Sequence, residues 1–236
     1  HGVMNTDNMS ILGETFDYGP YAFMETYDPN YICNHTDSHG RYSFSNQPSI
    51  AEWNCYALAS ALIDLISETE LRDILSKFND YFYDSLIEKY RKKLGFKSAQ
   101  DSDYDLLLGL FEIMETEKLD YTNTFRKLSK IISSSDNFKL SEKFSIWLTS
   151  YEDRLSKDEN SIEESKILMD KNNPKYILRN YLAQSAIEDA EQGKAEKIDE
   201  LAKVLINPYV DLGKSMEKYC QPAPKEQQNQ QLSCSS

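Results

Sequence analysis

Three oxygen-bearing side chains near the start of the chain, Asp7, Asn8 and Asp17, have the types and spacing expected for magnesium–nucleotide chemistry. Mg²⁺ is usually held by one or two protein oxygens together with phosphate oxygens of its substrate. The amide oxygen of Asn8 and the carboxylate of Asp17 therefore fit a metal site. Asp7, directly before Asn8, is placed to act as a base or to orient a nucleophile.

The residues between these side chains predict a short β-hairpin. Residues 9–12 and 15–17 are β-capable, and Gly13-Glu14 between them suits a tight turn. Such a hairpin would bring Asn8 and Asp17 side by side at its open end. Hairpins with Asn and Asp at their mouths are also common where no metal binds, so the spacing alone leaves an ordinary surface turn as the alternative.

The same segment resembles the catalytic loop and the Asp-Phe-Gly segment of protein-kinase-like phosphotransferases. His1-Gly2 stands at the start of the loop, Asn8 follows six residues after the glycine, and Asp17-Tyr18-Gly19 takes the place of Asp-Phe-Gly. Val3, however, occupies the position of the usual catalytic Asp. This departure is typical of a pseudokinase, or of a kinase fold that performs a different phosphate chemistry.

Further motifs extend over the whole chain. They are His1-Gly-Val-Met-Asn-Thr-Asp-Asn8-Met-Ser-Ile, Asp17-Tyr-Gly-Pro20, Tyr31-Ile-Cys-Asn-His35, Gly40-Arg-Tyr, Asn46-Gln-Pro48, Pro174-Lys-Tyr-Ile-Leu-Arg-Asn-Tyr-Leu182, Asn207-Pro-Tyr209 and Ser233-Cys-Ser-Ser236. Together they resemble the selenoprotein O family. The resemblance implies a kinase-like protein adenylyltransferase, which moves AMP from ATP, with Mg²⁺ or Mn²⁺, to Ser, Thr or Tyr hydroxyls of proteins. It also implies Asp7 as proton acceptor, Asn8 and Asp17 as metal ligands, and Asp17 at the ATP.

Two other functions remain open at this point. One is a conventional protein kinase that transfers the γ-phosphoryl group, and the other is a non-catalytic, nucleotide-binding pseudokinase. Val3 weakens the first because the usual base is missing, and the presence of Asp7, Asn8 and Asp17 weakens the second.

The resemblance also implies a protein about twice as long. We therefore expect this chain to be a C-terminal half that is inactive alone. The other half would carry the Gly-rich phosphate loop and the nucleotide-binding Lys.

Composition narrows the class of partners. The chain has 236 residues, 40% of them hydrophobic, which is enough for one large domain or two smaller ones. Acidic residues outnumber basic ones by 39 to 26, for a net charge of -13, which argues against nucleic acid as a partner. No apolar run is long enough for membrane insertion. ATP and protein substrates with hydroxyl side chains are the expected partners.

Hydrophobic periodicity predicts a nearly all-helical body behind the hairpin. The expected helices cover about 48–66, 70–94, 102–114, 120–133, 141–156, 161–171, 174–193 and 195–205. Pro48 suits a first turn, Gly95 a stop, and Ser102-Asp-Tyr-Asp105 and Ser161-Ile-Glu-Glu164 are capping boxes, the first with Asp in place of Glu. The predicted fold class is mainly α: the C-lobe of a protein-kinase-like fold with a short catalytic β-hairpin at its N-terminus.

Three regions follow from this pattern. Residues 1–47 would form the catalytic hairpin and an irregular, activation-like segment, 48–220 the helical C-lobe body, and 221–236 a flexible tail rich in Gln. Lys175 and Arg179, near the turn at Pro174, could face phosphate, but structural salt bridges are the favoured interpretation.

The cysteines at 33, 55, 220 and 234 lack C-x-x-C spacing and indicate a reducing compartment. The expected location is the cytoplasm if the protein is bacterial and the mitochondrion if it is eukaryotic. Cys33, His35 and His39 could hold zinc, but a fourth ligand is not evident, so ordinary loop residues are favoured. Cys55 lies at an apolar helical position and is interpreted as an inert core residue.

A redox role is predicted for Cys33 and Cys234. Cys33 lies sixteen residues after Asp17 in the segment expected to cross the site, and Cys234 is near the end of a polar tail long enough to reach back. A disulfide between them would be transient and regulatory in a reducing compartment. By resemblance, selenocysteine stands at the place of Cys234 in some relatives. The alternative is two unrelated thiols.

Overall fold

The structure is a computed structural model that describes residues 1–16, 18–19, 21–133 and 138–227. Over these residues the chain forms nine α-helices and four short 3-10 turns, and it has no β-strand. Isolated bridge positions occur at Thr26, which pairs with Asp120, and at Asn34. The predicted mainly-α class is therefore confirmed for the described chain. It divides into two compact units, an N-terminal unit of residues 1–22 and 28–86 and a C-terminal unit of 23–27 and 87–227.

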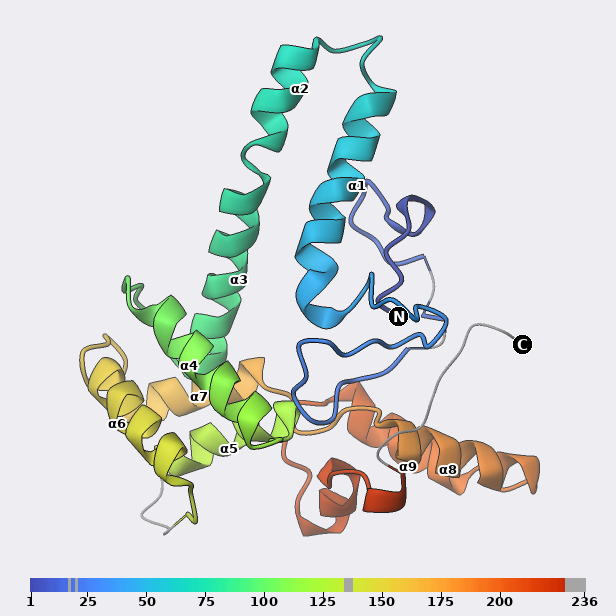
Figure 1. Ribbon diagram of the computed structural model, residues 1–236. Coiled ribbons are helices and arrows are strands. Elements are labelled where there is room, and N and C mark those ends of the chain that lie inside the picture. The colour runs from blue at the N-terminus through green and yellow to red at the C-terminus, as the bar shows by residue number, and fades with distance from the viewer. Residues whose placement is uncertain (17, 20, 134–137, 228–236) are drawn as a thin grey trace. The chain divides into compact units, whose positions relative to one another are not determined.

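The N-terminal unit consists of irregular loops packed beside helices. It contains a 3-10 turn at Thr6–Asn8, a second at Phe44–Asn46, α1 (Gln47–Ala61), α2 (Glu68–Leu75) and the first half of α3 (Phe78–Leu94). Figure 1 shows the N-terminal loops, in blue, lying beside α1. Pro48 lies in the first turn of α1, as its fixed φ favours.

Two predicted helix boundaries in this unit are wrong. The single helix predicted over 70–94 is broken at residues 76–77, where the hydroxyl of Ser76 donates to the carbonyl oxygen of Asp73 at 2.8 Å. Such a side-chain bond competes with the helical ladder. The predicted extension of α1 to residue 66 is also absent, and residues 62–65 form turns. Leu65 there is 81% exposed, so no apolar contact offsets the cost of ordering another turn.

The C-terminal unit contains the second half of α3 and α4 (Asp103–Thr116), α5 (Tyr121–Ile131), α6 (Glu142–Ser156) and α7 (Ile162–Asn172). Its core includes the fully buried side chains of Leu94, Phe96, Leu107, Leu110, Met114, Phe125, Leu128, Tyr151 and Met169. Gly95 ends α3 with φ +82°, as predicted. The capping box of α7 also forms, between Ser161 and Glu164.

The predicted capping box at Ser102 does not form. Ser102 makes no side-chain cap, and Asp103 instead points inward, fully buried, with one carboxylate oxygen 2.6 Å from Nε of Arg91 and the other 2.6 Å from Nε of Arg154. The backbone N–H of Gln100 donates to Asp103 at 2.9 Å. These buried ion pairs, which no local pattern signals, decide how α4 begins.

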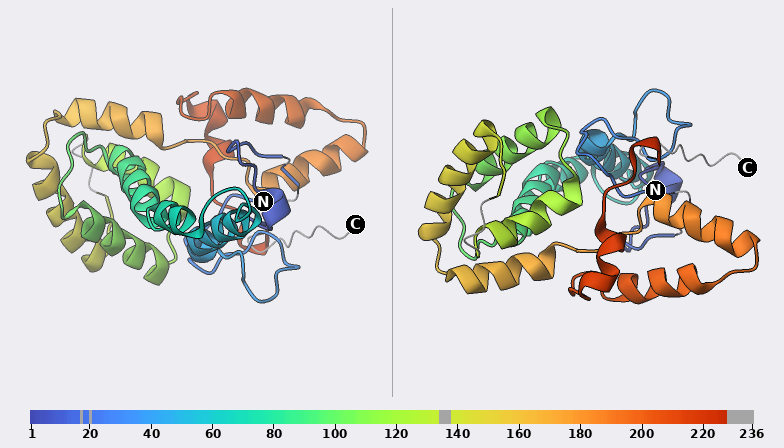
Figure 2. Two further views of the ribbon diagram at one scale, coloured as in Figure 1. Left: turned by 90° about the horizontal axis from the view of Figure 1, so that it is seen from above. Right: turned by 90° about the horizontal axis from the view of Figure 1, so that it is seen from below.

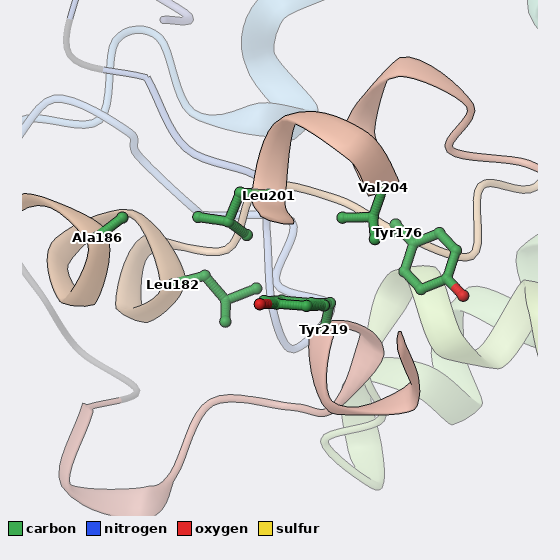
Figure 3. Close-up of a cluster of buried hydrophobic side chains, with 6 residues drawn as sticks. All are labelled: Tyr176, Leu182, Ala186, Leu201, Val204 and Tyr219. Carbon is green, nitrogen blue, oxygen red and sulfur yellow. The ribbon is translucent and has the colours of Figure 1, made fainter. Parts of the chain in front are cut away.

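The last helices, α8 (Asn180–Glu191) and α9 (Glu196–Ile206), pack against a 3-10 segment at Lys214–Cys220. Figure 2 shows α9 turning back alongside α8. The buried side chains between them, drawn in Figure 3, are Tyr176, Leu182, Ala186, Leu201, Val204 and Tyr219. This cluster forms a second small core within the C-terminal unit.

Helix α8 begins six residues later than the predicted start at 174. Residues 174–179 are irregular, and the backbone N–H groups of Lys175 and Tyr176 both donate to the carbonyl oxygen of Pro208, at 2.7 and 3.1 Å. A long-range contact to residue 208 thus holds the segment predicted to be the first turn of this helix. In the described part of the chain, no helix has the length and apolar character needed to cross a bilayer.

Candidate metal and nucleotide site

Asp7 and Asn8 lie together on an exposed 3-10 turn, Thr6–Asn8. The side-chain nitrogen of Asn8 donates to the carbonyl oxygen of Val3 at 3.0 Å. This bond fixes the amide and leaves Oδ1, which takes no hydrogen bond from the described residues, as the end that can bind a cation. An amide oxygen of this kind fits Mg²⁺ or Mn²⁺. The exposed carboxylate of the adjacent Asp7 fits the predicted base.

The predicted β-hairpin is not formed by the described residues of this segment. Ser10–Gly13 does form a turn, with the N–H of Gly13 donating to the carbonyl oxygen of Ser10 at 3.0 Å and a φ of +72° at the glycine. The residues on either side of the turn are not strands. A two-stranded hairpin is only marginally stable by itself, and Ile11 and Leu12 are 82% and 77% exposed, so no apolar face supports one.

Asp17, the second predicted metal ligand and the predicted ATP contact, lies outside the described residues. Its pairing with Asn8 remains a prediction. Among the described side chains, no three His, Cys, Asp or Glu residues gather as a metal site, and this includes the zinc alternative at Cys33, His35 and His39. Asn8 would therefore supply only part of a metal site, to which Asp17 and the phosphate oxygens of ATP would add ligands.

Side chains, not backbone ladders, hold the loop that carries Asp7 and Asn8. Asn54 on α1 is buried, and its side-chain nitrogen donates to the carbonyl oxygen of Met4 at 2.9 Å. The hydroxyl of Tyr42 donates to the side-chain oxygen of Asn5. Both residues were missed by sequence reasoning. The one available signal was an amide, Asn54, at the i+4 position from the buried Ile50 of α1.

A small pocket lies against the other end of this loop. It has a volume of about 10 Å³, room for about one water, and is lined by His1, Gly2, Val3, Ile32, Cys33, Asn34, Asp37 and Tyr42. Gly2 has a φ of +67°, and a Cβ there would stand 3.1 Å from Nε2 of Gln47. A glycine therefore suits this position for both its backbone angle and its close approach.

The pocket places Cys33 beside the His1-Gly2-Val3 loop, within the segment predicted to pass the site. Cys234, its predicted partner, lies outside the described residues, so the disulfide remains a prediction. Cys55 on α1 is only partly buried. Its burial, and to a lesser extent the nearby Glu52 carboxylate, raise the pKa of its thiol. A raised thiol pKa lowers the thiolate fraction and agrees with an unreactive Cys55.

Lys175 and Arg179 form structural ion pairs, which confirms the favoured interpretation. Nζ of Lys175 lies 2.6 Å from Asp211 and 2.8 Å from Glu217. Burial lowers the pKa of Lys175, but the bonds to these two carboxylates outweigh it and hold the pKa above its usual range. Arg179 is 1% exposed and pairs with Glu25 and Asp120.

Comparison with known proteins gives consistent matches. The family model "Protein adenylyltransferase SelO" matches residues 1–206. The chain is 43% identical over 243 residues to "Protein nucleotidyltransferase YdiU" of Pseudomonas fluorescens strain Pf0-1, and 42% identical over 247 residues to the protein of the same name in Vibrio vulnificus strain YJ016. Each alignment covers 100% of this chain and 50% of the relative. The chain thus spans about half the length of the curated relatives it matches.

Proposed function

The chain belongs to the SelO family of protein adenylyltransferases, and we propose that it forms the metal-holding half of an enzyme that transfers AMP from ATP to Ser, Thr or Tyr hydroxyls of proteins. The observation that carries this proposal is the bond from Asn8 to the carbonyl oxygen of Val3, which leaves an amide oxygen for a cation in a chain of this family. Asn8 and Asp17 would hold Mg²⁺ or Mn²⁺, and Asp17 would also contact ATP.

In the proposed reaction, the hydroxyl oxygen of the protein substrate attacks the α-phosphorus of ATP. A new phosphorus–oxygen bond forms, the bond to pyrophosphate breaks, and the hydroxyl proton passes to a base. Val3 cannot take this proton, and the exposed carboxylate of Asp7 on the Thr6–Asn8 turn is the acceptor we assign. The bound metal ion would neutralise negative charge on the phosphate oxygens.

Asn54 and Tyr42 have a supporting role in this scheme. By holding Met4 and Asn5 they restrict the loop on which Asp7 and Asn8 stand. A base positioned in advance avoids the entropic cost of orienting it in each turnover.

Two alternatives keep the same site but differ in the phosphate attacked. A conventional kinase would transfer the γ-phosphoryl group, and a pseudokinase would bind nucleotide without transfer. The test compares ATP labelled at the α- or the γ-phosphate, using the full-length protein that contains this chain. Label on the protein substrate from the α-position alone supports the proposal. Label from the γ-position, or from neither, overturns it in favour of the kinase or the pseudokinase.

The proposed partners are ATP and proteins that present hydroxyl side chains. The net charge of -13 makes a phosphate backbone an unfavourable partner, which agrees with the expectation of no nucleic-acid binding. We place the protein in a reducing compartment, the cytoplasm of a bacterium or the mitochondrion of a eukaryote, on the basis of its cysteine usage.

A further inference from the structure

Arg41 differs from the other arginines of the chain in its charge environment. Of the six arginines, five have a carboxylate within ion-pair distance, and these are Arg72, Arg91, Arg126, Arg154 and Arg179. Arg41 is exposed and has no such carboxylate among the residues that the structure describes. In a chain with a net charge of -13, a guanidinium without an internal partner is available to an external anion.

Aromatic rings hold the guanidinium of Arg41 in place. Its central carbon lies 5.0 Å from the ring centroid of Trp53 and 5.7 Å from that of Tyr42. A guanidinium attracted to an aromatic face forms no hydrogen bond to it, so its N–H donors can still bind a planar carboxylate through two hydrogen bonds. Arg41 is thus presented as a donor, and its charge is not neutralised by the rings.

The backbone at Arg41 is fixed from both sides. Asp37 accepts from the N–H of Arg41 at 2.9 Å and from the N–H of Tyr42 at 2.7 Å, and Asn46 donates to the carbonyl oxygen of Arg41 at 2.5 Å. Gly40, with a φ of +64°, allows the turn. A recognition residue held in this way loses little conformational entropy on binding.

This arrangement adjoins the candidate site. The hydroxyl of Tyr42 donates a hydrogen bond to the side-chain oxygen of Asn5, the residue directly before the Thr6–Asn8 turn. Trp53 and Tyr56, three residues apart on α1, are 51% and 45% exposed. Arg, Trp and Tyr are the side chains most enriched among the residues that dominate binding energy in protein interfaces.

We propose that Arg41, Trp53 and Tyr56 form a docking surface for the protein substrate, in which Arg41 binds an Asp or Glu carboxylate close to the acceptor hydroxyl. This inference rests on the proposed function and names the class of substrate. The net charge of -13 does not attract an acidic segment at long range, so Arg41 would supply specificity through a short-range contact. A phosphate of ATP also suits a guanidinium, but it gives no role to the exposed rings of Trp53 and Tyr56.

The test uses the full-length protein and a peptide library with a central Tyr, in which one flanking position carries either Glu or its neutral analogue Gln. Peptide binding is measured by fluorescence anisotropy, and AMP transfer is measured separately with α-labelled ATP. The variants are Arg41→Gln and, as a matched control, Arg72→Gln, which removes an exposed arginine from α2. The wild type should prefer a Glu peptide about tenfold at one or more flanking positions, as a charge-assisted bond can supply.

Arg41→Gln should bind the Glu and Gln peptides with nearly equal affinity, whereas Arg72→Gln should keep the preference for the Glu peptide. A preference that survives Arg41→Gln, or a wild type indifferent to Glu, overturns the docking surface. A rise in KM for ATP with an unchanged peptide preference also overturns it, because Arg41 would then contact phosphate. Binding that depends on Arg41 without transfer of the α-label would retain the docking surface and reject the proposed function.

Discussion

Asn54 donates a hydrogen bond to the carbonyl oxygen of Met4 at 2.9 Å, so a buried side chain of α1 supports the loop that carries Asp7 and Asn8. This relation joins positions 50 residues apart in the sequence. A buried residue of a helix thus holds the loop of the candidate site, and this role can be tested without altering Asp7 or Asn8.

The first prediction concerns this bond. Asn54→Asp keeps the size of the side chain but replaces the donor by an acceptor that faces another carbonyl oxygen. We expect it to lower the free energy of unfolding by about 1–3 kcal/mol, and to lower kcat for AMP transfer by about tenfold or more as the loop shifts. Urea denaturation and steady-state kinetics of the full-length protein measure the two effects. Asn79→Asp, at an exposed position of α3, is the control, and equal activity in the two variants would reject the positioning role.

The second prediction concerns the metal ligands. Asn8→Ala and Asp17→Ala should each weaken Mn²⁺ binding in the presence of ATP, as measured by electron paramagnetic resonance. Each should also slow AMP transfer, because several kcal/mol of transition-state stabilisation would be lost. Asp7→Asn is the matched comparison. It should lower kcat and leave the Mn²⁺ titration nearly unchanged, because its assigned role is to accept a proton. Normal Mn²⁺ affinity in Asn8→Ala and Asp17→Ala would remove both residues from the metal site.

The third prediction compares two glycines that both have positive φ. Gly95 has φ +82° and a Cβ there would lie 3.0 Å from Cγ of Met169, whereas Gly193 has φ +77° and open space around it. Both Gly→Ala variants carry a backbone cost, of about 1 kcal/mol. Only Gly95→Ala should add a packing cost, of about 1–3 kcal/mol. The difference between their unfolding free energies measures the close approach to Met169 and, at 3.1 Å, to the carbonyl oxygen of Ser165. Equal values would show that both neighbours move away without cost.

The fourth prediction concerns stability in acid. Burial raises the pKa of Asp158, but bonds from the N–H groups of Lys97 and Ser98, the hydroxyl of Ser98 and Arg154 outweigh it and lower the pKa from 3.8 to about 2. Because the folded-state pKa is the lower one, this carboxylate stabilises the fold above pH 3.8, and the stabilisation is lost as the pH falls towards 2.

The expected size of this effect is about 2 kcal/mol, from the shift in pKa. Asp158→Asn should therefore flatten the dependence of the unfolding free energy on pH between about pH 4 and 2. The neighbouring exposed residue gives the control, Glu159→Gln, which should keep the dependence of the wild type. An Asp158→Asn profile as steep as that of the wild type would contradict the assignment.

The fifth prediction concerns the cysteines. Mild oxidation of the full-length protein should produce a cross-linked peptide that joins Cys33 and Cys234, because Cys33 lies beside the His1-Gly2-Val3 loop and the polar tail is predicted to be long enough to reach it. Mass mapping of non-reduced peptides detects the product. Cys55, with its raised pKa, should stay unmodified. If Cys234→Ala leaves activity equally sensitive to reductant, the proposed redox switch is wrong.

The sequence alone located most of the helices. The apolar periodicity of segments such as 141–156 and the box at Ser161 and Glu164 act within one or two turns, and the structure has α6 and a capped α7 there. Gly95 likewise stops α3 through its own backbone freedom. Local signals of this kind involve residues within a few positions of one another, so they can be read without knowledge of the fold.

Two of the failures have a different origin. The irregular backbone at Lys175 is bonded to the carbonyl oxygen of Pro208, and the start of α4 depends on Asp103 pairing with Arg154. These partners are 33 and 51 positions away along the chain, respectively. Burial makes such contacts strong enough to override local propensity, since a buried donor or charge left unpaired costs several kcal/mol.

Some properties of the candidate site can be read from the sequence, and others appear only in the structure. The identities of Asp7 and Asn8, their adjacency and their resemblance to a family are properties of the sequence itself. Only the tertiary structure shows that Asn54 supports their loop and that Arg41, alone among the arginines, faces no carboxylate in the described chain. Position and charge environment depend on which distant groups fold together, because hydrogen bonds and ion pairs act over a few ångströms of space and not along the chain.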